Sequence, residues 1–322
     1  MEALPQHFRP RLAELAEQGV FIGTSSWKYP GWRGQLYQDD RYVWRGRFSE
    51  ARFEKLCLSE YSEFFRTVCV DAAYYKFPDQ KFLEQLFPLV SDNFLFSFKV
   101  TDRITLKRFP NLPRHGAQAG SENPDFLNAE LFEESFLEPC RAFQSRVGLL
   151  IFEFSRFQPT EFERGRDFAQ RVEDFLSRLP KGWRYGLEIR NRSFLHPEYF
   201  AMLRRQGVSH IYNSWDDMPA IEEQLNLAES RTNPEFFGAR MLLRPGRKYE
   251  EAVKLFSPYN EVKDPYPQCR TAGANLIRAT VASKGRAKGF IYVNNRLEGN
   301  ALSTIARMIE EAEENAIASP KA

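Results

Sequence analysis

Short apolar runs rich in β-branched and aromatic residues alternate along the chain with longer segments whose apolar residues recur at the helical period. The short runs predict eight strands: Val20–Thr24, Thr67–Ala72, Phe94–Thr101, Val147–Phe154, Tyr185–Arg190, Val208–Asn213, Ala239–Arg244 and Gly289–Asn294. The periodic segments predict helices: Arg11–Gln18, Glu50–Arg66, Gln80–Leu89, Glu130–Ser145, Phe162–Leu179, Pro197–Gln206, Cys269–Ser283 and Asn300–Asn315. Eight strands alternating with helices favour an α/β fold with parallel pairing, the (β/α)8 TIM-type barrel. A doubly wound open sheet is the alternative.

The connections between these elements are unequal in length. The long ones follow the first, third and seventh predicted strands: Ser25–Ser49, Asp102–Ala129 and Pro245–Gln268. All strand-to-helix loops of a barrel lie at the carboxyl ends of its strands, so this pattern predicts a site on the C-terminal face. Phe109–Asn128, rich in Pro, Gly, Asn and Ser, is either a lid over that face or a passive surface excursion.

The chain shows no internal repeat and no linker. We therefore expect a single domain over residues 1–322, with an N-terminal extension at 1–19 and a long loop or lid at 102–129.

Charge and composition exclude several classes of protein. Lys plus Arg number 45 and Asp plus Glu 43, and a net charge of +2 argues against binding nucleic acid or membrane through bulk charge.

No segment approaches the ~20 apolar residues of a membrane span, and Met1–Gly19 lacks the apolar core of a signal peptide. Four widely spaced cysteines, without metal or redox spacing, indicate reduced thiols. We expect a cytoplasmic protein without a membrane partner.

Charged residues end several strands that are otherwise apolar. Glu188 and Arg190 lie two positions apart and so share one face of their strand. Lys99, Glu153 and Asp71 occupy the ends of three neighbouring strands. The repetition favours a polar ligand site, and the alternative is a buried ion network that only closes the barrel.

The same residues suggest three chemistries. Glu153 and Glu188 resemble the carboxylate pair of a glycosidase, but Lys99 and Arg190 would hold both ionised, against the raised pKa that a proton donor needs. Those cations instead favour a phosphate or carboxylate ligand. A divalent metal bound by carboxylates at Asp71, Glu153 and Glu188 stays open.

Other cofactor and nucleophile signatures are missing from the sequence. The four histidines form no ligand-spaced pair, and no glycine-rich nucleotide motif or serine nucleophile elbow is present. The sequence thus identifies no cofactor.

The first long loop concentrates aromatic and basic residues in a chain that is 15% aromatic. It holds Trp27, Tyr29, Trp32, Tyr37, Tyr42, Trp44 and Phe48, interleaved with Lys28, Arg33, Arg41, Arg45 and Arg47. Rings stack on bases and Arg pairs with phosphate, so residues 27–48 suit a nucleotide or single-stranded nucleic acid. The alternative is that the rings form a small core for the loop itself.

Several motifs together resemble one known family. They are Gly23-Thr-Ser-Ser-Trp27-Lys-Tyr29-Pro-Gly-Trp32-Arg-Gly34-Gln-Leu-Tyr37, Asp71-Ala-Ala-Tyr74-Tyr75-Lys-Phe-Pro78, Phe98-Lys99-Val-Thr-Asp-Arg-Ile104-Thr105, Gly148-Leu-Leu-Ile-Phe152-Glu153, Glu188-Ile-Arg190-Asn191, Arg244-Pro-Gly246-Arg and Val293-Asn294-Asn295. In this order, over almost the whole chain, they resemble the YecE-like proteins, or domain of unknown function 72. The resemblance implies a TIM-type barrel and a site but no reaction, since the family's activity is not established.

Three positions depart from the pattern of many family members. Leu106 and Asn191 stand where others carry His, and Glu153 where others carry Gln. The loss of two imidazoles makes a histidine-based mechanism less transferable to this chain.

The leading hypothesis is a TIM-barrel protein, an enzyme or a binder, with a site for a small anionic ligand that is phosphorylated or sugar-like. The catalytic candidates are Glu188, Lys99 and Glu153, with Glu188 as general base or electrostatic partner. The ligand-binding candidates are Arg190, Asn294, Asn295, Asp71, Tyr75, Trp27 and Trp32. Nucleic-acid binding through residues 27–48 and a non-enzymatic barrel with a structural ion network are the alternatives.

Overall fold

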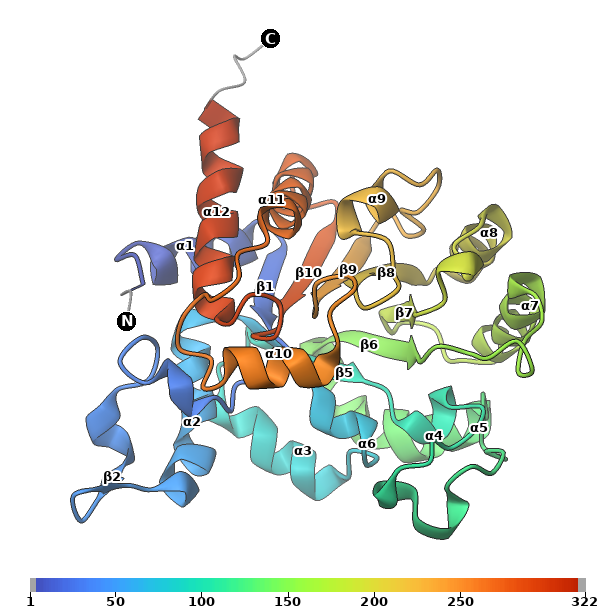
Figure 1. Ribbon diagram of the computed structural model, residues 1–322, viewed down its shortest axis with the longest axis horizontal. Coiled ribbons are helices and arrows are strands. Elements are labelled where there is room, and N and C mark those ends of the chain that lie inside the picture. Colours follow the sequence, from blue (N-terminus) through green and yellow to red (C-terminus); the bar gives the residue numbers. More distant parts are fainter. Residues whose placement is uncertain (1–3, 318–322) are drawn as a thin grey trace.

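The computed structural model describes residues 4–317, and the side chains of residues 4–314. Eight parallel strands form one sheet in the order β1-β10-β9-β8-β7-β6-β5-β4, which follows the chain around a nearly closed barrel (Figure 1). The strands are β1 (Val20–Thr24), β4 (Thr67–Val70), β5 (Leu95–Lys99), β6 (Val147–Phe154), β7 (Tyr185–Ile189), β8 (Ser209–Ser214), β9 (Phe236–Met241) and β10 (Lys288–Val293). The predicted (β/α)8 TIM-type barrel is confirmed, and the doubly wound sheet is wrong.

Helices surround the strands, and in Figure 1 they lie outside the central sheet on all sides. They are α1 (Phe8–Glu17), α2 (Glu50–Phe64), α3 (Gln80–Leu86), α4 (Asp102–Thr105), α5 (Ala129–Phe132), α6 (Glu138–Cys140), α7 (Gly165–Ser177), α8 (Pro197–Gln206), α9 (Ile221–Leu225), α10 (Tyr249–Phe256), α11 (Pro267–Ala282) and α12 (Ala301–Ile317). No helix of residues 4–317 is long and apolar enough to cross a membrane.

Alternation along the strands creates two separate apolar cores. Leu187 and Ile189 of β7 belong to the large core between the strands and the helices. A second, smaller core fills the barrel and consists of Phe21, Cys69, Leu95, Leu149, Ile151, Ile211, Phe236, Phe290 and Tyr292. Because side chains two apart share a face, the next inward positions toward the carboxyl ends are Asp71, Lys99 and Glu153.

The seam between β1 and β4, the two ends of the sheet order, is bridged by a side chain. The hydroxyl of Tyr61, from α2, accepts from the backbone N–H of Thr24 and donates to the carbonyl of Thr67, both at 3.1 Å. The strands approach so closely that a Cβ at Gly23 would lie 2.2 Å from that same carbonyl oxygen. Tyr61 thus links the backbones of the first and second barrel strands.

Most predicted limits lie within a few residues of the structure, and two elements differ more. The strand predicted at Ala239–Arg244 spans Phe236–Met241, because the apolar residues Leu242 and Leu243 pack instead in a separate loop cluster. The predicted helix at 130–145 is divided into α5, a π-turn, α6 and a 3-10 segment. Pro139 lies within this stretch, and its missing N–H removes a helical hydrogen bond.

The long loops contain structure of their own. Loop 25–49 carries the hairpin β2 (Val43–Trp44) and β3 (Arg47–Phe48), which projects from the lower left of Figure 1. The loop after β9 contains α10. In loop 102–129, Asn123 Nδ2 donates to the carbonyls of Arg103 and Leu106 at 2.7 and 2.6 Å. A lid function for 102–129 and the single-domain organisation stay predictions.

Candidate functional site

A layer of charged side chains covers the barrel core at the carboxyl ends of the strands. It contains Asp71, Lys99, Glu153, Glu188, Arg190 and Arg240, here called the charged cluster. The residues come from β4, β5, β6, β7 and β9 or the positions directly after them. Five of them are predicted site residues, and the structure brings these five together around the sixth, Arg240.

Arg240 lies at the centre of the charged cluster. Its Nη1 lies 2.7 Å from Glu188 Oε2 and 3.1 Å from Glu153 Oε2, and its Nη2 lies 3.0 Å from Asp71 Oδ1. Glu153 and Glu188 are aligned with each other in the β6–β7 pairing, so one guanidinium reaches both carboxylates. The side chains of Arg240 and Glu188 are 2% and 0% exposed. Three ionic contacts offset the cost of burying this charge.

Lys99 and Arg190 form the outer cationic part of the cluster. Lys99 Nζ lies 2.5 Å from Glu153 Oε2, and Arg190 Nη2 lies 2.8 Å from the same oxygen. Nε and Nη2 of Arg190 also lie 3.4 and 3.3 Å from Glu188 Oε1. Both cationic side chains are 11% exposed, whereas the carboxylates beneath them are fully buried. The two outer cations thus lie over the buried Glu153 and Glu188, while Asp71, at 33%, is the most exposed member of the cluster.

The mutual charges shift the pKa of several members. Burial alone would raise the pKa of Glu153, but Arg190, Lys99 and Arg240 together outweigh it and hold that pKa far below its usual range. Burial lowers the pKa of Lys99, opposed by Glu153 and assisted by Arg240 and Arg190. The pKa of Arg240 is raised well above its ordinary value, because the surrounding carboxylates outweigh the effect of burial. The shifts of Glu153 and Arg240 thus favour their charged forms, whereas the lowered pKa of Lys99 disfavours its charged form.

Aromatic rings orient the two outer cations. Lys99 Nζ lies 3.5 Å from the ring centroid of Tyr74, and the guanidinium carbon of Arg190 lies 3.7 Å from that of Trp215. Such stacking restricts the side-chain rotamers and adds cation–π attraction. Tyr74 itself is positioned by the turn after β4, which Thr101 Oγ1 holds by donating to the Ala73 carbonyl at 2.8 Å.

A cavity of about 400 Å³ opens beside this part of the cluster. Tyr75, Arg114 and Asp102 are among its lining residues. The guanidinium carbon of Arg114 lies 5.1 Å from the ring centroid of Tyr75 and 5.6 Å from that of Tyr74. Tyr75 is 65% exposed and lines this cavity, and its role as a wall of the site stays a prediction.

The other predicted ligand-binding residues lie outside the charged cluster. Trp32 is fully buried, and its Nε1 donates to Asn295 Oδ1 at 3.2 Å. That oxygen also accepts from the backbone N–H of Ala301 at 2.7 Å. Asn294 is buried and its Oδ1 accepts from the N–H of Arg296. Trp27 is 8% exposed and belongs to the main core. All four residues are therefore held by contacts within the protein, near the carboxyl ends of the strands.

Sequence reasoning missed Arg240, the central residue. The alternation in Phe236-Phe-Gly-Ala-Arg240-Met241 places Arg240 on the inward face with Phe236. The predicted strand begins at Ala239, so it places Arg240 near the amino end of the strand. The predicted site lies at the carboxyl ends of the strands. Trp215, the ring under Arg190, was also not among the predicted site residues.

Among residues 4–317, no group of three His, Cys, Asp or Glu side chains is arranged to hold a metal ion. Asp71, Glu153 and Glu188 do converge, but the cation between them is the guanidinium of Arg240. The three carboxylates therefore already contact three cations of the protein, Arg240, Lys99 and Arg190.

Fold and site together define a TIM-type barrel protein with a charge-lined carboxyl face. The chain belongs to the DUF72 family, since the family model described as a protein of unknown function, DUF72, matches residues 21–322. A DUF72 family protein from Enterococcus faecalis V583 has a similar structure, with a TM-score of 0.58 and 16% identity over 91% of this chain and 95% of that one. A DUF72 family protein from Thermotoga maritima MSB8 is also similar, with a TM-score of 0.54 and 17% identity over 92% of this chain and 99% of that one. No curated protein sequence matches the chain.

Proposed function

We propose that the carboxyl face of the barrel binds a small anionic ligand, a phosphorylated and sugar-like molecule, through Arg190 and Lys99. The observation that carries this proposal is the arrangement of these two cations, each 11% exposed, above carboxylates that are wholly buried. Their counterions lie beneath them, so the donors on the solvent side are available to a ligand.

Donor capacity supports the proposal. Within the described part of the chain, Arg190 uses Nε and Nη2 for Glu188 and Glu153, and Nη1 meets no protein acceptor. Lys99 has three N–H groups and contacts one carboxylate oxygen, on Glu153. A hydrogen bond to a charged group contributes about 1.5–3 kcal/mol, so two cations with fixed orientation provide useful affinity.

Asp71 favours a ligand that also carries hydroxyl groups. Its side chain is 33% exposed while one oxygen is held by Arg240. A carboxylate accepts hydrogen bonds from hydroxyls but repels phosphate. An anionic group over Arg190 and Lys99 with hydroxyls toward Asp71 describes a sugar phosphate.

In this proposal Glu153 and Glu188 act as positioning residues. The pKa of Glu153 is held far below its usual range, and Glu188 is buried against the guanidinium groups of Arg240 and Arg190. A glycosidase requires a protonated carboxyl of raised pKa, which this arrangement opposes. Their role is to hold the cations in place.

The test is the ligand-induced shift in melting temperature with glucose 6-phosphate, using glucose and inorganic phosphate as partial ligands. We expect the sugar phosphate to raise the melting temperature of the wild type, and Arg190→Gln or Lys99→Gln to abolish the rise. Lys55→Gln, which removes one exposed and unpaired positive charge on α2, is the matched control and should keep it. Retention of the full shift in Arg190→Gln and Lys99→Gln would show that the site is elsewhere.

A second candidate function rests on the β2–β3 hairpin. Trp44 is 56% exposed, and the guanidinium carbons of Arg52 and Arg45 lie 4.8 and 5.9 Å from its ring centroid. By contrast Tyr37, Tyr42 and Trp32 are fully buried and belong to the main core. An exposed ring between cations suits base stacking next to phosphate, which supports binding of single-stranded nucleic acid.

A filter-binding assay with an unlabelled-competitor series of oligonucleotides over several salt concentrations tests this second function. Affinity should fall steeply with salt, and Trp44→Ala should weaken it. An affinity that does not depend on salt, or that Trp44→Ala leaves unchanged, would show that the hairpin does not bind nucleic acid.

A further inference from the structure

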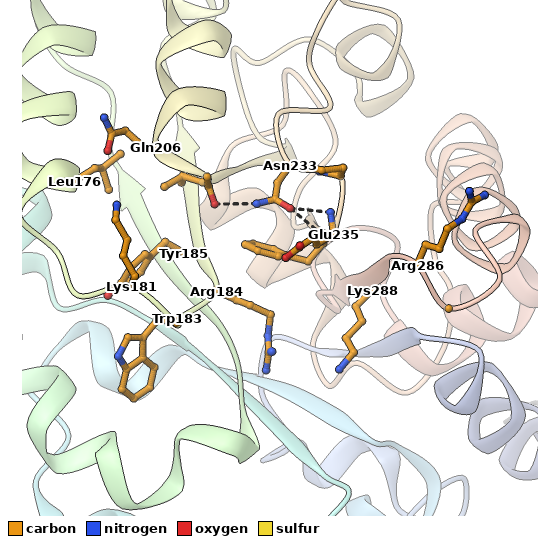
Figure 2. A pocket seen from close by; sticks show the side chains of 16 residues that line it. Leu176, Lys181, Trp183, Arg184, Tyr185, Gln206, Asn233, Glu235, Arg286 and Lys288 are labelled. Carbon is orange, nitrogen blue, oxygen red and sulfur yellow. Dashed lines mark hydrogen bonds between the residues drawn. The ribbon is translucent and has the colours of Figure 1, made fainter.

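A second cavity, of about 700 Å³, lies at the opposite end of the barrel from the charged cluster. Its walls come from the residues that precede or begin β7, β8, β9 and β10, so it opens at the amino ends of the strands. Figure 2 shows side chains from these segments around the cavity, with Trp183 and Lys181 on one side and Arg286 on the other.

The charges of this cavity are unbalanced. Its ionisable residues are four cations and one carboxylate: Lys181, Arg184, Arg286, Lys288 and Glu235. Within residues 4–317 none of the five makes an ion pair, whereas every cation of the charged cluster contacts a carboxylate. Unpaired cations gathered in a concave surface create a positive potential that attracts anions.

Arg184 is held rigidly in this cavity. Its Nε donates to the carbonyl of Gly148 at 2.9 Å and its Nη2 to that of Val147, which leaves Nη1 with no acceptor in the described chain. Its guanidinium carbon lies 6.0 Å from the ring centroid of Phe290, a residue of the inner barrel core. The guanidinium therefore lies over the amino end of the barrel interior.

Lys288 extends beside Arg184, and Figure 2 shows the two side chains pointing the same way. Burial and the neighbouring charge of Arg184 both lower the pKa of Lys288, and burial lowers the pKa of Arg184. Among residues 4–314, whose side chains are described, no carboxylate pairs with either cation, so a bound anion would relieve this repulsion.

The opposite wall is pre-organised by Asn233. Its Nδ2 donates to the carbonyl of Gly207 at 2.8 Å, and its Oδ1 accepts from the N–H groups of Glu235 and Phe236 at 2.9 and 3.1 Å (Figure 2). Gly207 ends α8 in the left-handed conformation, with φ of 68°. These bonds fix the loop before β9, and Lys288 joins it through a backbone bond to the Glu235 carbonyl at 2.8 Å.

We propose that this amino-end cavity is a second binding site, for a small molecule that carries at least two phosphate groups. One phosphate is bound between Arg184 Nη1 and Lys288 Nζ, and the next is reached by Lys181 or Arg286 at the edges. The cations are spread across the cavity, so a single monovalent anion engages only part of them. The concave shape favours a small ligand over an extended polymer.

The test is calorimetric titration of the full chain with inorganic diphosphate at constant ionic strength. We expect saturable binding. Lys288→Gln should lower the affinity about tenfold, a loss of ~1.4 kcal/mol in binding free energy. Lys181→Gln should also weaken it, though less because Lys181 lies at the edge. Lys288 and Lys181 are exposed and their side chains make no hydrogen bond or ion pair with the described residues, so both variants are expected to fold. Lys55→Gln is the control for the loss of one charge, and its affinity should be unchanged.

Arg190→Gln separates this site from the carboxyl face, because it should leave diphosphate binding intact even if sugar phosphate binding is lost. Affinity should decline at alkaline pH in the wild type as Lys288 loses its proton, and Lys288→Gln should show a shallower decline, to which Lys181 still contributes. Absence of saturable binding, or equal weakening by Lys55→Gln, would overturn the proposal. So would tighter, Lys288-dependent binding of an oligonucleotide than of diphosphate, which would assign the cavity to a nucleic acid.

Discussion

Arg240 and Glu188 form an ion pair of 2.7 Å inside the barrel, between side chains that are 2% and 0% exposed. The pair lies directly on the apolar layer of the barrel core, and Arg240 also contacts Glu153 and Asp71. A change at this one residue therefore alters the charge balance of the whole carboxyl face.

Arg240→Met should reduce the free energy of unfolding strongly. It leaves Glu153 and Glu188 buried with only part of their counter-charge, and breaking a buried pair in this way costs about 3–5 kcal/mol. Arg204→Met is the matched control, since Arg204 pairs with Glu229 at 42% and 52% exposure and a surface pair contributes about 0–1 kcal/mol. Urea unfolding of both variants measures the difference. Equal losses would mean that Arg240 contributes no more than a surface ion pair.

Tyr61→Phe tests the bridge that closes the barrel. The substitution removes the hydroxyl between Thr24 and Thr67 and leaves a buried N–H and a buried carbonyl without that partner, at a cost of about 1–3 kcal/mol. Tyr249→Phe, at a ring that is 43% exposed, should change stability little. Thermal unfolding followed by circular dichroism gives both values, and an unchanged melting temperature in Tyr61→Phe would refute the role of the bridge.

His210 should make stability depend on pH between its unfolded and folded pKa values. Burial lowers the pKa of His210 from 6.5 to about 3, and its Nδ1 lies 3.2 Å from the hydroxyl of Tyr199. Below pH 6.5 the unfolded chain binds a proton that the native state rejects, so stability falls as pH falls through this window. The free energy of unfolding should fall by about 1.4 kcal/mol per pH unit in this window. Above pH 7 His210 does not affect stability.

The comparison variant for this prediction is His210→Gln. Its urea-unfolding free energy should show a shallower decline between pH 6 and 4 than the wild type, while carboxylates contribute equally to both. Parallel declines in the two proteins would show that His210 titrates normally.

All four cysteines should be protected in the native protein. Cys57, Cys69, Cys140 and Cys269 are buried and unpaired, and burial raises the pKa of Cys57 and Cys140 to about 12. Because the thiolate is the reactive form, a thiol reagent at neutral pH should label none of them before unfolding and all four in urea. Rapid labelling of one native thiol would place that cysteine in an open segment.

Much of the fold was accessible from local pattern. The strands Val20–Thr24 and Val147–Phe154 and the helix Pro197–Gln206 have the predicted limits, because apolar periodicity reports which backbone geometry buries a segment. The pattern misplaced β9, where Leu242 and Leu243 extend the apolar run into a loop with its own small core. A run of apolar residues indicates that these side chains are buried, but it does not indicate which of the separate apolar clusters they join.

The sequence by itself determined a parallel barrel, the end of the barrel where charge accumulates, and the identity of five of the six residues of the charged cluster. Only the tertiary structure decided how they are paired. It placed Arg240 between carboxylates from three other strands, and it joined Trp32 to Asn295 across almost the whole chain. It also gathered Arg184 and Lys288 at the amino end, where neither makes an ion pair within residues 4–317. Periodicity depends on neighbours along the chain, whereas the partner of a polar side chain depends on which distant strand lies beside it.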